Sequence, residues 1–189
     1  RHTPTRIAVT RAGNVIGGGD WAADRIVPDA IRAWSAHAPV VVRSPRATRP
    51  WQHVLEPLSG YLWLGARLLA RADGLNGEAF NFGPGDLVNA TVAELLDAMT
   101  VRWPGVRWDV PKGLEQGGRE AALLKLCCDK VLFCLKWRVT LDFHETVAFT
   151  VDWYRTWHDG KQDLAAYSVE QIEGYCQLAA RREAPWIRH

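Results

Sequence analysis

The sequence lacks most of the short motifs by which enzymes are recognised. It contains no G-x-G-x-x-G dinucleotide fingerprint, no P-loop, no G-x-S-x-G elbow and no H-E-x-x-H zinc motif. No tyrosine has a lysine four residues later, because those positions hold Gly65, His158, Gln171 and Ala179. We therefore assign no catalytic residue within these 189 residues.

Cysteine is scarce, and its spacing does not suit a metal site. The four cysteines, Cys127, Cys128, Cys134 and Cys176, include no C-x-x-C pair, so we predict reduced, buried thiols and no metal. A net charge of +2 is too small to indicate nucleic acid or a membrane as a partner. With no apolar run near 18 residues and no signal-peptide pattern, we expect a cytoplasmic protein. The chain begins with Arg1 instead of methionine, which suggests a fragment.

What the sequence does contain is a glycine-rich stretch close to its beginning. An apolar run at 7–9 leads through Ala12, Gly13 and Asn14 to three glycines at 17–19. Consecutive glycines let the backbone turn sharply and approach a ligand closely. A strand, a glycine-rich turn and a helix in that order place ligands at the carboxyl ends of strands in doubly wound sheets. A tight crossover turn without a ligand is the alternative.

Apolar periodicity predicts alternating helices and strands, and so an α/β protein. Helices are expected from Asp24 to about 36, at 56–70, from Thr91, from Asp129 to about 137, at 143–159 and from Ser168; extended segments are expected at 40–43, 49–54, 79–82, 106–110 and 122–126. Thr91 and Glu94 form a capping box, and Asp129 and Ser168 are expected N-caps. Leu58, Leu62 and Leu69 are expected on the buried side of helix 56–70.

Several polar side chains follow the expected strands: Asn14, Asp24, Arg25, Arg43, Arg49, Asn81 and Arg119. Arginines near glycine turns suit a diphosphate, because the guanidinium fork matches phosphate oxygens bidentately. A solvated surface residue is the alternative for each arginine, and Arg49, between a turn and an extended segment, is the strongest candidate. Asn81 is either a satisfied amide or a ligand contact. His53 is expected to be structural, because no Ser or Asp partner pattern surrounds it.

Two longer segments stand out, T-R-A-G-N-V-I-G-G-G-D-W at 10–21 and A-T-R-P-W-Q-H-V-L-E-P-L-S-G-Y at 47–61. Together they resemble the CDP-glucose 4,6-dehydratase family of the extended short-chain dehydrogenase/reductase group. Shorter matches at 80–84, 124–126 and 150–154 follow in order. The likeness covers nearly the whole chain but only the C-terminal half of the family's length.

The resemblance implies the C-terminal part of a doubly wound NAD(P)-binding Rossmann-like fold, with its last parallel strands, plus a small mixed α/β substrate-binding lobe. Residues 1–23 would end the dinucleotide-binding sheet, parts of 50–83 would return to it, and 24–189 would form mainly the lobe and the C-terminal helices. The implied function is an NAD-dependent lyase that converts CDP-glucose to CDP-4-keto-6-deoxyglucose plus water, as a homodimer when full-length. The family's fingerprint and catalytic Tyr and Lys would precede Arg1, so we expect the chain alone to be inactive and weakly folded.

The resemblance also assigns roles to residues of this chain. Its substrate-binding positions would be Asn14, Asp24, Arg25, Ile26, Arg49, Asn81 and Arg119. The backbone of Ala12 and Gly13 would pass under the nicotinamide of NAD. A nucleotide-sugar epimerase or reductase of the same superfamily, and a non-catalytic remnant that binds a nucleotide sugar or nothing, are the alternatives, because the pocket residues alone separate these poorly.

Overall fold

The computed structural model describes residues 5–84, 89–111 and 126–188. Its elements in chain order are β1 (Val9–Ala12), β2 (Val15–Ile16), α1 (Ile26–Ser35), β3 (Val40–Val41), β4 (Thr48–Arg49), β5 (Gln52–His53), α2 (Leu55–Leu69), β6 (Ala79–Phe82), β7 (Ala90–Thr91), α3 (Val92–Arg102), β8 (Trp108–Asp109), α4 (Asp129–Leu135), α5 (Phe143–Asp159), α6 (Leu164–Arg181) and the 3₁₀ turn η1 (Pro185–Arg188). The predicted α/β class is confirmed. The predicted strand at 122–126 falls almost wholly outside the described residues.

Parallel pairing dominates among the described strands. β1 pairs with β6, β2 with β5 and β3 with β8, all in parallel, whereas β4 and β7 are antiparallel. In the first pair Ala12 lies opposite Phe82, so both strands end at the same edge. Segments that leave that edge are therefore brought together, which is where doubly wound sheets bind ligands.

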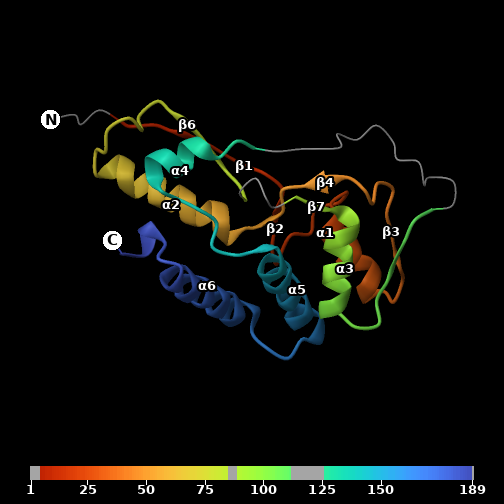
Figure 1. The fold of residues 1–189 in the computed structure, drawn as a ribbon. Helices are drawn as coiled ribbons and strands as arrows, with labels where there is room; N and C mark the ends of the chain where they lie inside the picture. Colours follow the sequence, from red (N-terminus) through yellow and green to blue (C-terminus); the bar gives the residue numbers. More distant parts are fainter. Residues whose placement is uncertain (1–4, 85–88, 112–125, 189) are drawn as a thin grey trace.

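Two hydrophobic clusters organise the molecule (Figure 1). The first, which we name the helical core, lies among α1, α3 and α5; its largest buried members are Trp34, Leu95, Leu96, Met99 and Tyr154. The second, which we name the sheet region, contains β1, β6, α2 and α4 and is built on Trp63, Leu64, Phe80, Phe82, Val131, Leu135 and Trp137. Within the helical core α5 packs against α3, and α6 runs beneath α2 (Figure 1).

The helix starts show which of the predicted caps are correct. The capping box is confirmed, since Glu94 N donates to Thr91 Oγ1 at 3.1 Å and Thr91 N donates to Glu94 Oε2 at 2.6 Å. The predicted cap at Asp129 is wrong, because α4 begins after Cys128 with no side-chain cap. The cap at Ser168 is wrong too. The N-cap of α6 is Asp163, more than a full turn before Ser168, and its carboxylate accepts from Ala165 N at 2.9 Å.

The predicted buried side of α2 is also wrong. Leu58, Leu62 and Leu69 are 45%, 76% and 87% exposed. The buried face instead carries Glu56, Pro57, Ser59, Gly60, Trp63 and Leu64. Gly60 explains why this face is the buried one. A Cβ at Gly60 would lie 2.2 Å from the Phe82 ring, so the absence of a side chain lets the helix approach β6 closely.

The prediction of buried thiols is also wrong, because Cys127 and Cys134 are exposed while Cys128 and Cys176 are half-buried.

A buried polar cluster joins α2 to the C-terminal helices. The Glu56 carboxylate accepts from Thr140 N at 2.9 Å, Leu141 N at 2.6 Å and Tyr175 Oη at 2.9 Å. Ser59 Oγ accepts from Tyr175 Oη at 3.0 Å. Burial raises the pKa of Glu56 to about 7, although these hydrogen bonds oppose the rise. The carboxyl group therefore fixes the segment before α5 and the middle of α6 against α2.

Candidate functional site

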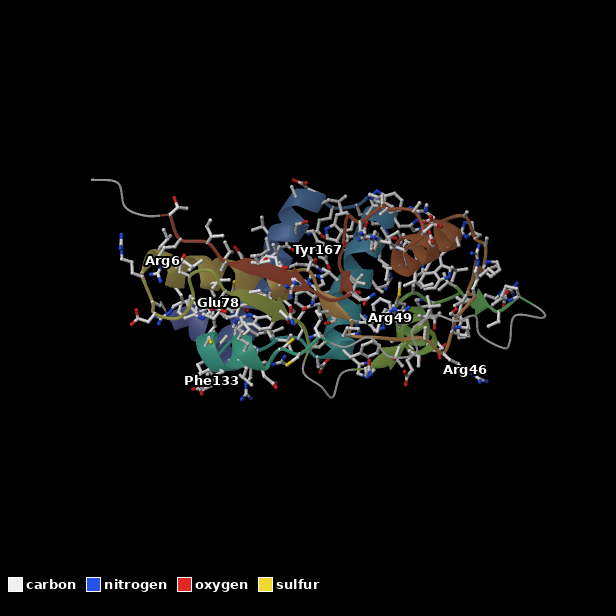
Figure 2. The ribbon with its side chains drawn as sticks, turned by 90° about the horizontal axis from the view of Figure 1, so that it is seen from above. Arg6, Arg46, Arg49, Glu78, Phe133 and Tyr167 are labelled. Carbon is white, nitrogen blue, oxygen red and sulfur yellow. The ribbon has the colours of Figure 1, made fainter. Side chains whose placement is uncertain are left out.

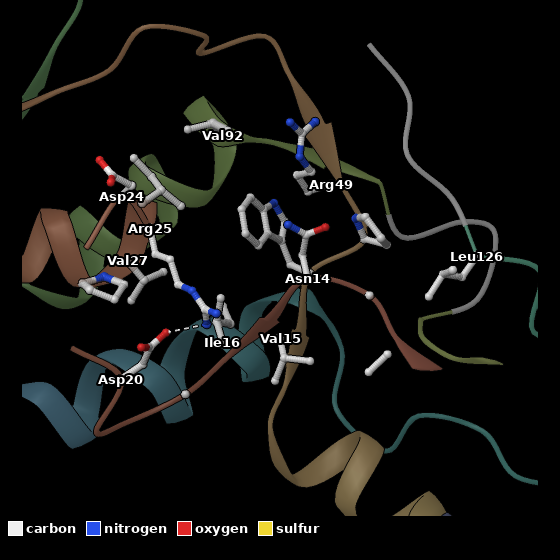
Figure 3. Close-up of a pocket in the computed structure, with 17 residues that line it drawn as sticks. Asn14, Val15, Ile16, Asp20, Asp24, Arg25, Val27, Arg49, Val92 and Leu126 are labelled. Atoms are coloured by element: carbon white, nitrogen blue, oxygen red, sulfur yellow. Dashed lines mark hydrogen bonds and ion pairs between the residues drawn. The ribbon is translucent and has the colours of Figure 1, made fainter. Parts of the chain in front are cut away.

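A cavity of about 640 Å³ opens beyond the carboxyl ends of β1 and β2, against the start of α1 (Figure 3). Its lining consists of Ala12, Gly13, Asn14, Val15, Ile16, Gly17, Asp20, Asp24, Arg25, Ile26, Val27, Pro28, Arg49, Pro50, Trp51, Val92 and Leu126. The volume is in the range of pockets that hold small organic ligands. Most walls are apolar, with a few polar groups among them.

Three polar side chains come from separate elements. Asn14 lies in the turn between β1 and β2, and its amide makes no hydrogen bond to another described residue. Arg49 comes from β4, where its Nη1 donates to the Thr48 carbonyl at 2.8 Å. Arg25 precedes α1, and its Nη1 lies 3.1 Å from Asp20 Oδ2 (Figure 3). Two guanidinium groups and an amide therefore border one cavity.

The N-terminus of α1 adds backbone donors to this border. The helix begins after Arg25 with no side-chain cap, and Asp24 before it has a left-handed φ of 62°. The first N–H groups of a helix have no partner within it, and the helix dipole makes that end favourable for an anion. An uncapped helix start beside two arginines thus suits a phosphate group.

Most of the predicted site residues that the structure describes come together here, and Asn81 does not. Ala12, Gly13, Asn14, Asp24, Arg25, Ile26 and Arg49 all line the cavity. Asn81 does not line it, because its Nδ2 donates to the Cys127 carbonyl at 3.0 Å and its Oδ1 accepts from Arg11 Nη1 at 3.3 Å. Arg119 lies outside the described residues. The binding roles of all these residues stay predictions.

The structure adds lining residues that the sequence reasoning missed. Trp51 forms part of the wall and donates from Nε1 to the Ala90 carbonyl at 3.1 Å. Asp20 is the partner of Arg25, and the five-residue spacing of these opposite charges was the available signal. No sequence signal indicated that Trp51 lines the cavity, because its hydrogen-bond partner Ala90 lies far along the chain and is brought close only by the fold.

Helix α5 supports the loop that carries Asp20. Tyr154 Oη donates to the Asp20 carbonyl at 2.7 Å, and the Trp21 ring lies 5.3 Å from the Tyr154 ring and 4.6 Å from the Trp157 ring, between centroids. A Cβ at Gly18 would overlap the Trp153 ring at 2.1 Å, so only glycine fits there. The glycine run thus serves close packing against α5.

His53 is buried and does not line the cavity. Its Nδ1 accepts from Leu55 N at 3.3 Å, and burial lowers its pKa to about 4. The imidazole is therefore neutral near pH 7. This environment supports the structural role predicted for it.

The comparisons with known proteins decide the resemblance. No protein-family model matches the chain. The chain is 39% identical over 175 residues to CDP-glucose 4,6-dehydratase of Salmonella typhimurium, an alignment that covers 93% of this chain and 48% of that enzyme. The predicted resemblance to CDP-glucose 4,6-dehydratase is confirmed. The chain spans about half the length of this curated relative.

Solved structures confirm the fold. A UDP-glucuronic acid 4-epimerase of Bacillus cereus, in complex with UDP-glucuronic acid and NAD, has a TM-score of 0.65 at 14% identity, over 80% of this chain and 46% of its own. A dTDP-glucose 4,6-dehydratase of Bacillus anthracis with NAD has a TM-score of 0.57 at 17% identity, over 79% and 44%. The chain thus has the C-terminal part of a doubly wound Rossmann-like fold. Among the described residues no helix is long and apolar enough to cross a membrane.

Proposed function

We propose that this chain is the substrate-binding part of an NAD-dependent nucleotide-sugar 4,6-dehydratase, which converts CDP-glucose to CDP-4-keto-6-deoxyglucose and water. The observation that carries the proposal is the convergence of Asn14, Arg25, Arg49 and an uncapped helix start on one cavity. The 39% identity to the Salmonella dehydratase supports this reaction in particular. The epimerases that share the fold do so at a lower identity, 14–20%.

The polar border suits a sugar diphosphate for electrostatic reasons. Arg49 and the N–H groups at the start of α1 supply positive potential on two sides of the cavity. Arg25 is held by Asp20 in this structure and is 62% exposed, so it can exchange the carboxylate for a phosphate oxygen without unburying apolar surface. Asn14 would donate its free amide hydrogens to the ligand.

NAD is the proposed cofactor, and a small part of its site fits this chain. The backbone of Ala12 and Gly13 lines the cavity at the end of β1, and a Cβ at Gly13 would lie 3.2 Å from Pro50 Cγ. Gly13 is therefore packed closely against Pro50, and we propose that its backbone faces a bound ring. The chemistry that bound NAD would supply there is reversible hydride transfer with the sugar. Because this chain has no dinucleotide fingerprint, we assign the remaining NAD contacts, and those of the proposed homodimer, to the part of the relative that the chain does not match.

Titration calorimetry with CDP-glucose tests the binding half of this proposal. Replacing Arg49 with alanine removes a charge-assisted contact worth about 1.5–3 kcal/mol, so affinity should fall roughly 10- to 150-fold. Arg46→Ala is the matched control, since Arg46 is exposed, does not line the cavity and lies toward the end of the molecule in Figure 2, whereas Arg49 lies further inward. Equal affinities of the two variants would contradict the proposal.

The reaction itself is best tested in a chimera that joins this chain to the unmatched portion of the Salmonella dehydratase. With NAD and CDP-glucose, mass spectrometry should show a product lighter by one water. A product of unchanged mass with inverted C4 would indicate an epimerase. Tight binding without turnover would indicate a remnant that binds a nucleotide sugar.

A further inference from the structure

Gln52 is a buried side chain behind the cavity that the proposed function does not use. It lies on β5 with 1% of its surface exposed. Its Nε2 donates to the carbonyl of Phe82, the last residue of β6, at 2.9 Å, and to the carbonyl of Gly13 at 3.4 Å. Its backbone N–H donates to the Asn14 carbonyl at 3.1 Å. One residue thus connects the ends of β1 and β6 to β5.

These contacts fix the amide in one orientation. The Oε1 atom is buried and accepts no hydrogen bond from the residues that the structure describes, so the two carbonyls alone orient the group. Without the amide, the Phe82 and Gly13 carbonyls would be left short of a donor in a site closed to water, which native structures avoid. The turn that carries Asn14 would keep its backbone bonds, the β1–β6 pairing up to Ala12 and the bond from Gln52 N to the Asn14 carbonyl, and would lose the side-chain bonds that fix Gly13 relative to Phe82.

We propose that Gln52 is a positioning residue for the nucleotide-sugar pocket. It fixes the position of the turn 12–14 relative to the end of β6. The Asn14 amide and the backbone of Ala12 and Gly13 then face the same ligand. Gln52 is not among the lining residues and acts only through the turn. This inference rests on the proposed function, because the pocket that it serves is the one assigned to CDP-glucose.

The first test removes the donor and keeps the shape. Gln52→Met should weaken CDP-glucose binding by the purified protein about tenfold, the effect of one lost hydrogen bond. Gln171→Met is the matched control, since Gln171 Nε2 donates to the Phe149 carbonyl at 2.7 Å between α6 and α5, away from the cavity. Both variants should lose some thermal stability, and only the first should lose affinity.

Gln52→Glu supplies a second readout, which packing alone would not produce. A protonated carboxyl group can donate to the Phe82 carbonyl, whereas a carboxylate would face two carbonyl oxygens, which raises its pKa. Relative to the wild-type protein at the same pH, affinity should be nearly normal at about pH 6 and at least about tenfold weaker at about pH 8.5. Glu56 titrates in both proteins and cancels in this ratio.

The outcomes separate the two proposals. If the wild-type protein binds CDP-glucose and both Gln52 variants bind it equally well at both pH values, the positioning role is overturned. If Gln52→Met does not fold, the pH dependence of Gln52→Glu decides alone. If the wild-type protein does not bind CDP-glucose, the proposed function fails, and the positioning role fails with it.

Discussion

The helical core and the sheet region differ in how fully this chain covers them. In the helical core Trp34 is 2% exposed, and Leu95, Leu96 and Met99 are completely buried among α1, α3 and α5. In the sheet region α2 covers one side of the β1–β6 pair. Val9, the first residue of β1, is 51% exposed, and Ile7 just before the strand is 63% exposed. The exposed leucines of α2 add further apolar surface on the same region.

This difference indicates where the stability of the chain resides. Parallel strands are normally covered on both faces, and exposed apolar patches favour association. The helical core meets that requirement with its own helices, and the sheet region meets it on one face only. If the chain folds weakly or aggregates, as predicted, we expect the sheet region to be the cause.

The largest expected effect is in the helical core. Trp34→Ala should lower the free energy of unfolding by about 3–5 kcal/mol, because it leaves a cavity and removes the bond from Nε1 to the Arg107 carbonyl. Phe133→Ala in α4 is the contrast, since that ring is 77% exposed and the change should stay within about 0.5 kcal/mol. Denaturant unfolding measures both. Similar losses for the two variants would remove the distinction between the regions.

An intermediate effect is expected where α2 meets the C-terminal helices. Glu56→Gln places an amide NH₂ group among backbone donors and should cost about 1–3 kcal/mol near pH 4.5. The folded pKa of Glu56, about 7, lies above its ordinary value of 4.5, so the folded state binds the proton more tightly. Wild-type stability from this group is then complete below pH 4.5 and is lost as the pH rises to about 7.

Thermal melts of the two proteins across that window measure this effect. The stability advantage of the wild-type protein over Glu56→Gln should shrink as the pH rises, and other titrating groups such as Glu145 cancel in the difference. An advantage that is constant with pH would show that Glu56 keeps one protonation state throughout. It would also weaken the view that this carboxyl couples the two regions.

The smallest effect on stability is expected for the exposed leucines of α2. Replacing Leu58, Leu62 and Leu69 with glutamine should change the free energy of unfolding by less than about 0.5 kcal/mol each. Solubility should rise, because the uncovered apolar surface is reduced. Light scattering against protein concentration measures this rise. A large loss of stability would mean that this face is covered after all.

Some local signals in the sequence predicted the ends of elements correctly where the burial was predicted wrongly. The strand Ala79–Phe82, the capping box at Thr91 and the end of α5 at Gly160 depend on residues within one turn of each other, and all three are confirmed. The buried side of α2 depends on Tyr175 and the segment at 140–141, which lie far along the chain. Leucine spacing could not reveal that a glutamate faces inward.

The candidate site follows the same pattern. Asn14 lies in the glycine-rich stretch, Arg49 lies in the 47–61 segment and Arg25 follows the first stretch. All three border one cavity, and their binding roles stay predictions. Asn81 could not be placed from its strand position, because its partners Arg11 and the Cys127 carbonyl come from other parts of the chain. The cap at Asp163 was missed and Ser168 was predicted instead, because serine also favours helix starts; in the structure its Oγ donates to the Leu164 carbonyl inside α6.

The closely spaced, tilted rings of Trp21 and Trp157 give the protein a built-in optical reporter. Their centroids are 4.6 Å apart, and Trp21 adjoins Asp20, the partner of Arg25 at the cavity mouth. Two indoles this close couple their strongest electronic transitions, which produces a paired circular dichroism band in the far ultraviolet. An anion that draws Arg25 away from Asp20 would disturb this pair, so ligand entry can be followed by spectroscopy without any label.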